Sequence, residues 1–236
     1  MKLCDLHTHV LPGVDDGADT LDCALQMLEN AAASDVTLLA VTPHCGGIFG
    51  NILDENLQAR FRQLQDAARD IPVELVLGGE ARVDDQFLTL LAQKKLPTIG
   101  DSRYLLTEFA PDEREFSATL ESILELGYIP LIAHPERYIS VCKKPQIVLP
   151  WLDMGCHLQL TGGSILGEHG KTVQRTSAFL LHNDLVACVA SDAHGLHRRS
   201  NFLMHVYDHL SVQYSKHYAA CLLHHNPLAI CRDEDI

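Results

Sequence analysis

Short apolar runs rich in β-branched residues alternate along this chain with segments that have the spacing of amphipathic helices. Runs of this kind are typical of strands buried on both faces of a parallel sheet. Seven of them are expected to be strands: residues 2–6, 36–41, 73–77, 104–107, 130–133, 157–160 and 186–190. Parallel strands need long crossover connections, usually helices, so the alternation predicts an α/β fold.

The intervening segments predict the helices of about seven β/α units. In the first of them, Leu21, Ala24, Leu25 and Leu28 follow the i, i+3, i+4 spacing of a helix with one buried face. Helices are expected over residues 20–34, 54–69, 84–93, 115–126, 145–154, 164–182 and 200–224. With no repeat, low-complexity stretch or Pro/Gly/Ser linker, one domain over residues 1–236 is expected. The pattern leaves a closed barrel and an open doubly wound sheet as alternatives.

The composition narrows the class of protein. A formal charge of −13 disfavours sequence-independent binding of nucleic acid, which needs basic residues to replace phosphate counterions. Neither a signal peptide nor a transmembrane span is expected. The eight cysteines are scattered, form no C-x-x-C pair and lie mostly in apolar surroundings, so reduced thiols used in core packing are expected. These features predict a cytoplasmic enzyme.

Ionisable side chains lie just past the ends of six of the seven expected strands. The carboxyl ends of parallel strands share one face, where such folds carry their active sites. Imidazole and carboxylate ligands suit Zn²⁺, Mn²⁺ or Fe²⁺, and this set is too large for one ion. Two or three ions with a bridging carboxylate would activate water and stabilise charge on a phosphoryl group. The residues are His7, His9, His44, Glu80, Glu108, His134, Asp192 and His194.

Each of these residues alone would be read as a polar residue at the rim of the fold, and only their joint placement predicts a metal centre. The histidines of the C-terminal stretch have no such context and are read as a solvated or partly buried helix face. They are His205, His209, His217, His224 and His225. A thiol-based phosphatase mechanism needs the spacing C-x5-R, and no cysteine here has arginine six positions later.

Several motifs, in this order, resemble the PHP (polymerase and histidinol phosphatase) superfamily. More narrowly, the chain is similar to the bacterial PHP-type protein tyrosine phosphatases of capsule and exopolysaccharide gene clusters, from residue 5 to about residue 200. The segment from Gln159 to Gly167 resembles the family's sixth-strand region. The motifs are Asp5-Leu-His7-Thr-His9, Asp15-Asp16-Gly17, Thr42-Pro-His44, Gly79-Glu80, His134-Pro-Glu-Arg137-Tyr138 and Ser191-Asp192-Ala-His194.

The resemblance implies a distorted (β/α)7 barrel that holds three divalent metal ions, with Mn²⁺ the first candidate and Fe²⁺ or Zn²⁺ the alternatives. It assigns one ion to His7, His9, Glu80 and Asp192. A second ion is assigned to Glu80, Glu108 and His134. A third is assigned to Asp16, His44 and His194. Asp16 is preferred to Asp15 as a ligand, although spacing alone does not separate the two.

The resemblance also implies roles for individual residues. Glu108 marks the tyrosine phosphatase subfamily, since many other PHP enzymes have histidine there. Arg137 and Arg199 match two arginines that hold the phosphate, as a guanidinium fork can. The alternative for Arg137 is an ion pair with Glu136 or a neighbouring ligand, and the adjacent Arg198 leaves the register of Arg199 open. Together with Asp192, these two arginines are the expected catalytic residues.

The expected reaction is hydrolysis of phosphotyrosine in protein, with attack on phosphorus in line and the ions and Arg137 neutralising the phosphoryl oxygens. The alternatives are a small-molecule phosphatase of the histidinol phosphate type, a phosphodiesterase or exonuclease, and a catalytically idle regulator that docks on a kinase. By resemblance, the substrate is the tyrosine-rich tail of a membrane-associated bacterial tyrosine kinase that regulates polysaccharide synthesis and export.

Overall fold

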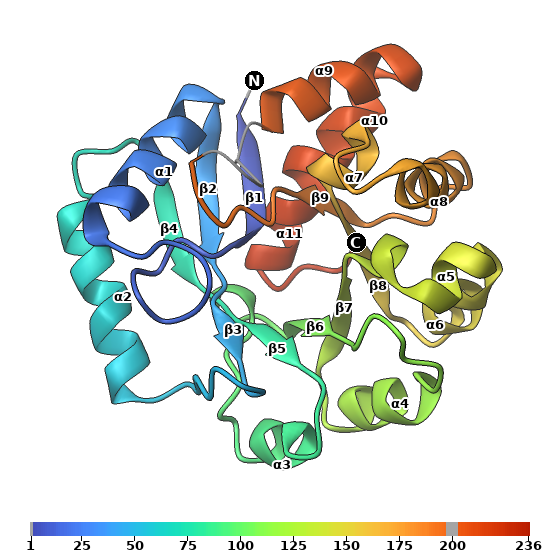
Figure 1. Ribbon diagram of the computed structural model, residues 1–236, viewed down its shortest axis with the longest axis horizontal. Coiled ribbons are helices and arrows are strands. Elements are labelled where there is room, and N and C mark those ends of the chain that lie inside the picture. The colour runs from blue at the N-terminus through green and yellow to red at the C-terminus, as the bar shows by residue number, and fades with distance from the viewer. Residues whose placement is uncertain (1, 197–202) are drawn as a thin grey trace.

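The strands of the protein lie around the middle of the molecule and the helices lie outside them (Figure 1). This computed structural model describes residues 2–196 and 203–236. All seven expected strands are confirmed, and two of them continue into a second short strand. The strands are β1 (Leu3–Thr8), β2 (Val36–Val41), β3 (His44–Cys45), β4 (Glu74–Leu77), β5 (Glu80–Arg82), β6 (Tyr104–Glu108), β7 (Ile129–Ala133), β8 (His157–Thr161) and β9 (Cys188–Ala190).

The strands form a distorted barrel. Their ladders are parallel and fall into two sheets, of order β1-β2-β4 and β3-β5-β6-β7-β8-β9. Because β3 follows β2 and β5 follows β4, the two sheets are parts of one run of seven strands. The ends of this run meet where Thr8 forms a parallel bridge with Ala193, whose carbonyl oxygen accepts a 2.9 Å hydrogen bond from the amide of His9. Within the second sheet β6 pairs with β5, whereas β4 is the last strand of the first sheet, and this break distorts the ring.

Helices cover the outside of the strands. Side-chain caps begin several of them: for example, the Thr20 hydroxyl accepts from the amide of Cys23, and the Asp54 carboxylate accepts from the amide of Leu57. The helices are α1 (Leu21–Ala33), α2 (Glu55–Ala67), α3 (Phe87–Ala92), α4 (Ser117–Glu125), α5 (Ile139–Lys143), α6 (Leu149–Asp153), α7 (Gly162–Leu166), α8 (Lys171–His182), α9 (Leu203–Gln213), α10 (Lys216–Ala220) and α11 (Asn226–Cys231), with single turns η1 (Ile99–Asp101), η2 (Pro135–Arg137), η3 (Pro145–Val148) and η4 (Cys221–His225).

Two long helices expected from the sequence are broken. The segment 164–182 divides into α7 and α8, because Gly167, with a φ of 92°, ends α7, and Gly170, with a φ of 90°, precedes α8. The segment 200–224 divides where Ser215 takes an extended conformation and caps α10. The expected helix at 145–154 is the turn η3 followed by α6. In the described parts of the chain, none of the helices is both long and apolar enough to cross a membrane.

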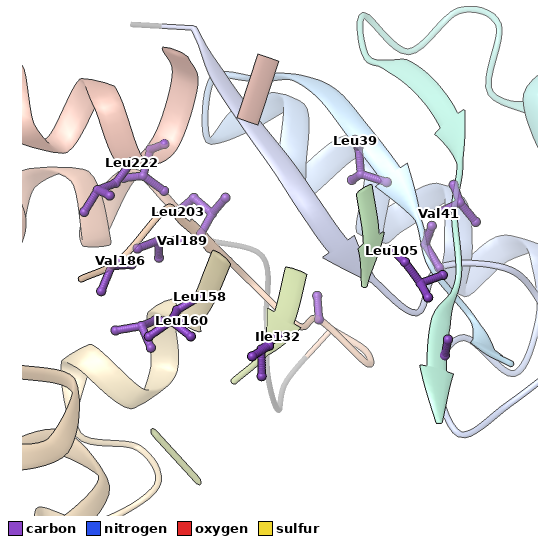
Figure 2. Close-up of a cluster of buried hydrophobic side chains, with 14 of the residues drawn as sticks. Leu39, Val41, Leu105, Ile132, Leu158, Leu160, Val186, Val189, Leu203 and Leu222 are labelled. Carbon is purple, nitrogen blue, oxygen red and sulfur yellow. The ribbon is translucent and has the colours of Figure 1, made fainter. Parts of the chain in front are cut away.

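Alternation along the strands separates two apolar layers. Leu105 of β6, Ile132 of β7 and Leu160 of β8 belong to the larger cluster, which Figure 2 shows together with residues of β2, β9, α9 and η4. Tyr104 and Leu106, on the other face of β6, pack inside the barrel with a second cluster. This cluster also contains Cys4, Leu6, Leu38, Ala40, Ile99, Leu131, Ala133, Cys188 and Ile230.

The inner layer fills one end of the barrel and leaves the other end for polar residues. Ile99 of η1 and Ile230 of α11 belong to this layer, so the turn and the last helix plug the end where the strands begin. Glu108 comes two residues after Leu106 on the same face of β6, at the carboxyl end of the strand. The eight cysteines are all free, and burial raises the pKa of the Cys156 thiol to about 12, which keeps it protonated.

Candidate metal centre

The ends of β1 and the loop after it supply the first residues of the site. His7 is the penultimate residue of β1, His9 follows the strand, and both are fully buried. The loop folds back over His9 so closely that a β-carbon on Gly17 would lie 2.0 Å from the His9 carbonyl oxygen. Only glycine fits there, and this turn brings Asp15 and Asp16 beside the histidines.

Four ligand atoms converge at the buried end of the site. The Nε2 atoms of His7 and His9 lie 3.2 Å apart. The Glu80 Oε2 atom is 3.4 Å from the first and 3.3 Å from the second. The Asp192 Oδ1 atom is 3.4 Å and 3.5 Å from the same two nitrogens. Ligands at roughly 2.1 Å from a tetrahedral ion are about 3.4 Å apart, so the atoms of His7, His9 and Glu80 fit a divalent metal ion, and Asp192 faces the same two nitrogens.

The partners of the two histidines support the same conclusion. The Nδ1 atom of His7 donates to the side-chain oxygen of Gln159 at 2.9 Å, and the Nδ1 atom of His9 donates to Asp15 at 2.8 Å. In the neutral form of each ring, the Nε2 atom presents a lone pair toward two carboxylates, as a metal ligand must, and orienting partners of this kind are usual behind metal-ligating histidines. Burial opposes protonation of the two rings, but without a metal ion the neighbouring carboxylates raise the pKa of both histidines.

The charges at this end of the site hold one another ionised. Burial would raise the pKa of the Glu80 carboxyl, but contacts with His7, His134 and His44 hold this pKa well below its usual value. Burial likewise opposes ionisation of Asp192, yet His7, His9 and Arg137 hold its pKa well below the ordinary range. Both carboxylates are therefore available as anionic ligands at neutral pH.

Glu80 lies at the centre of the whole group. Its Oε2 atom faces His7, His9 and also His44, whose Nδ1 atom is 2.9 Å away. Its other oxygen, Oε1, accepts from the His134 Nε2 atom at 2.8 Å. A carboxylate with both oxygens directed at different histidines has the arrangement required to bridge two ions.

Further ligand atoms surround this centre in two more groups. His9, Asp16, His44 and His194 present ligand atoms within 4.8 Å of one another, as do His44, Glu80 and Glu108. The second group differs from the expected set of Glu80, Glu108 and His134, because His44 rather than His134 lies with the two carboxylates. His134 remains in contact with Glu80 only through its hydrogen bond.

The two acidic neighbours of the first loop have different positions. The Asp15 side chain accepts hydrogen bonds from the amides of His44 and Gly17 as well as from the His9 ring. These hydrogen bonds hold the Asp15 side chain at the Nδ1 atom of His9, where Asp15 orients the ring. Asp16 is 57% exposed and lies 3.4 Å from His44 Nε2 and 3.5 Å from His194 Nε2, so its carboxylate is the one directed into the site.

Arg137 faces the metal-binding groups from η2. Its Nη1 atom donates to Asp192 Oδ2 at 2.6 Å, and its Nη2 atom contacts the Thr161 hydroxyl at 2.8 Å and His169 Nε2 at 2.9 Å. The alternative of an ion pair with a neighbouring ligand is therefore present, with Asp192 as the partner. Glu136 is not this partner, because its buried carboxylate accepts from the amide and hydroxyl of Thr161. The other expected phosphate-binding residue, Arg199, and its neighbour Arg198 lie outside the described residues.

Strained backbone accompanies two of these residues. His134 has a φ of 35° and Asp192 a φ of 55°, both in the left-handed region that residues with a β-carbon adopt at a cost. Such conformations persist where the surroundings impose them, often at functional sites. A pocket of about 320 Å³ opens over both residues and is lined by Asp16, His44, Glu80, Glu108, Phe109, Pro111, His134, Arg137, Tyr138, Asp192 and His194.

Sequence reasoning did not assign roles to several side chains at the site. Arg82 donates to the Glu108 carboxylate at 2.8 Å, and the Phe49 ring lies parallel to the His44 ring, with centroids 5.1 Å apart and planes 2° apart. The sequence does mark Gln159 as a candidate site residue, since it is a polar residue between two leucines of a buried strand. His169 and Phe49 lie in loops, where no periodicity marks them.

The fold and the site define the class of protein: a parallel α/β barrel with groups of histidines and carboxylates that could hold metal ions at the carboxyl ends of its strands. A model of the capsular polysaccharide synthesis CpsB/CapC family matches residues 3–232. The chain belongs to this family.

Individual relatives agree with this assignment. The chain is 30% identical to the tyrosine-protein phosphatase CpsB of Streptococcus pneumoniae over 98% of this chain and 99% of the relative. It is 32% identical to the tyrosine-protein phosphatase YwqE of Bacillus subtilis, over 84% and 80% of the two chains. A crystal structure from a study of YwqE and CpsB, described as unique metal-dependent tyrosine phosphatases, superimposes with a TM-score of 0.92 at 28% identity, covering 99% of this chain and 96% of the other.

Proposed function

We propose that this chain is a metal-dependent protein tyrosine phosphatase formed by a single domain over residues 1–236. The observation that carries the proposal is the convergence of His7, His9 and Glu80 at separations that suit a divalent ion, with Asp192 facing the same two histidines. The relatives CpsB and YwqE, named as tyrosine-protein phosphatases, support the choice of substrate.

We propose that the centre holds three divalent ions, with Mn²⁺ the first candidate and Fe²⁺ or Zn²⁺ the alternatives. The ligands would be the nine residues His7, His9, Asp16, His44, Glu80, Glu108, His134, Asp192 and His194. When bound, the ions would supply an activated water and neutralise phosphoryl charge. Four carboxylates contribute about four negative charges and three divalent ions six positive charges, so the loaded site would attract an anion within an acidic protein.

The protein's own residues would bind and orient the phosphoryl group. Arg137 lines the same pocket as the ligands, and its guanidinium can turn from Asp192 to a pair of phosphate oxygens once Asp192 ligates a metal ion. Thr161 and His169 would keep the other end of the guanidinium in place. Arg199 remains the second candidate for holding the phosphate. Burial of the ligands excludes bulk water and strengthens each of these electrostatic contacts.

The partner that we propose is the tyrosine-rich tail of a membrane-associated bacterial tyrosine kinase that regulates capsule or exopolysaccharide synthesis. The description of the matched family supports a role in polysaccharide synthesis. Eight free cysteines suit the reducing cytoplasm, which is where we place the protein. Co-purification under mild conditions from a cell that makes such a kinase tests the pairing, and recovery without the kinase would count against it.

Metal dependence and substrate class can be tested together. Protein stripped with a chelator should be inactive, and added Mn²⁺ should restore cleavage of a phosphotyrosine peptide. Glu108→Ala should lose most of this activity, whereas Glu121→Ala, which removes an exposed carboxylate from α4, should retain it. Full turnover by metal-free protein would refute the mechanism. Faster cleavage of histidinol phosphate or of a dinucleotide diester would replace the proposed substrate, and intact metal binding without any turnover would indicate a regulator.

A further inference from the structure

A second pocket adjoins the metal centre and is not explained by the ligands. It has a volume of about 620 Å³, within the range of small-molecule sites. Its lining residues are His44, Gly46, Gly47, Ile48, Phe49, Arg82, Val83, Asp84 and Glu108. Because His44 and Glu108 also line the inner pocket of about 320 Å³, the two spaces meet at these residues.

The wall of this outer pocket carries exposed apolar side chains. Ile48 is 96% exposed and Phe49 is 38% exposed, although both are large hydrophobic residues. The Phe49 ring lies parallel to the His44 ring, which orients it beside the metal centre. An apolar surface at the mouth of a polar site is suited to a ligand that is apolar beyond its charged group.

The loop that carries Phe49 is anchored at both ends. The Gly47 amide donates to the Asp84 carboxylate at 3.0 Å, and the Gly46 amide donates to the Asn51 carbonyl oxygen at 2.9 Å. The Asn51 side chain in turn donates to the carbonyl oxygens of His44 and Val14. These bonds hold the wall in one position before a ligand arrives, and this lowers the entropy cost of binding.

Arg82 and Asp84 form the polar part of the same pocket. Both already have partners, since Arg82 donates to Glu108 and Asp84 accepts from Gly47. Their charges are thus compensated within the protein, and they do not make the pocket a site for a second phosphate. What remains available at the junction with the metal centre is the ring of Phe49 and the Ile48 side chain.

We propose that this pocket, formed by Ile48, Phe49 and Val83, binds the aromatic ring of an aryl phosphate and thereby selects phosphotyrosine over alkyl phosphate esters. The inference rests on the proposed function and deepens it. The phosphoryl group would occupy the inner pocket beside Arg137, and the ring attached to it would cross the junction at His44 and Glu108. Ring contacts with Phe49 and apolar contacts with Ile48 provide the selectivity, because serine and threonine esters place no ring there.

The first test compares a phosphotyrosine peptide with a phosphoserine peptide of the same sequence. Phe49→Ala should lower kcat/KM for the phosphotyrosine peptide about tenfold, mostly through KM, because it removes one aromatic contact and its buried area. The value for the phosphoserine peptide should change much less, so the selectivity ratio falls. Phe49→Tyr should retain the ratio. An unchanged ratio in Phe49→Ala would overturn the proposal.

Tyr214→Ala is the matched control. Tyr214 is 37% exposed, close to the exposure of Phe49, but its ring packs on Tyr218 rather than on a metal ligand. This variant should keep the wild-type selectivity ratio. If it lowers the ratio as far as Phe49→Ala does, loss of any exposed aromatic residue has the same effect and the assignment of the pocket is wrong.

A binding measurement separates this inference from the proposed function. Metal-loaded protein is titrated calorimetrically with phenylphosphonate and with methylphosphonate, neither of which needs to be hydrolysed. The wild type should bind the phenyl compound at least tenfold more tightly, and Phe49→Ala should remove most of this difference. Equal affinities in the wild type would refute the aryl pocket even if phosphotyrosine is cleaved. A clear preference without any phosphatase activity would leave the pocket standing and refute the proposed function.

Metal content is measured in each variant, because Phe49 contacts a metal ligand. If Phe49→Ala binds less metal, Ile48→Ser decides the question, since Ile48 is almost fully exposed. Ile48→Ser should reduce the preference for phenylphosphonate while retaining the metal. A preference equal to that of the wild type would overturn the proposal.

Discussion

Replacing Asp15 by asparagine should weaken metal binding without removing an ion from the centre. The Asp15 carboxylate accepts from the His9 ring and the His44 amide through Oδ2 and from the Gly17 amide through Oδ1. Asparagine offers a single acceptor oxygen, so an NH₂ group must face one of these three donors. The His9 ring then loses the partner that keeps its proton on Nδ1 and its lone pair toward the metal.

The size of this effect follows from the role of such partners. Loss of the group that orients a metal-ligating histidine typically costs about 10–100-fold in metal affinity. Each tenfold is about 1.4 kcal/mol, so a loss of roughly 1.4–2.8 kcal/mol in metal binding is expected. Asp16→Asn should differ in kind, because this carboxylate faces His44 and His194 directly. That variant should bind fewer ions per chain.

The assay is titration of chelator-stripped protein with Mn²⁺, with elemental analysis of the loaded product. Asp19→Asn, which removes an exposed charge from the same loop, should behave as the wild type. The reasoning would be refuted if Asp15→Asn bound fewer ions while Asp16→Asn retained the full number. In that case Asp15 would be the ligand and Asp16 the bystander.

Three further predictions concern stability, each measured by urea unfolding of the metal-loaded protein. Gly17→Ala should destabilise the fold by roughly 1–3 kcal/mol or more, because its β-carbon would overlap the His9 carbonyl oxygen; stability equal to that of the wild type would mean that the loop shifts freely. Leu160→Ala should cost about 2–5 kcal/mol by leaving a cavity between β8 and the helices, and a much smaller loss would show that the site collapses. Burial lowers the pKa of His157, so the unfolded chain binds this proton more readily than the folded protein does. The stability that neutral His157 contributes is therefore present above pH 6.5 and is lost as the pH falls. Between pH 7.5 and 5.5, the free energy of unfolding of His157→Gln should fall less than that of the wild type.

The strands and the positions of the candidate ligands could be predicted because both are local properties of the chain. An apolar run such as residues 104–107 has the composition of a buried parallel strand, and Glu108 is the next residue after it. The helix boundaries were less accessible. The breaks at Gly170 and Ser215 depend on single residues whose backbone conformation the helical spacing around them does not reveal.

The amino-acid sequence by itself determined the α/β class, the ligand types at the strand ends and the lack of a cysteine with arginine six residues later. Only the tertiary structure decided that the two ends of the strand run meet at Thr8 and Ala193, that Glu80 lies between the histidines and that Asp15 stands behind His9. The difference lies in how far apart along the sequence the interacting residues are. A strand and the residue after it are neighbours in sequence, whereas the hydrogen bond from His7 to Gln159 joins residues 152 positions apart and exists only once the barrel has closed. Phe49, by contrast, stacks on His44 only five residues away, but it lies in a loop where no periodicity marks it.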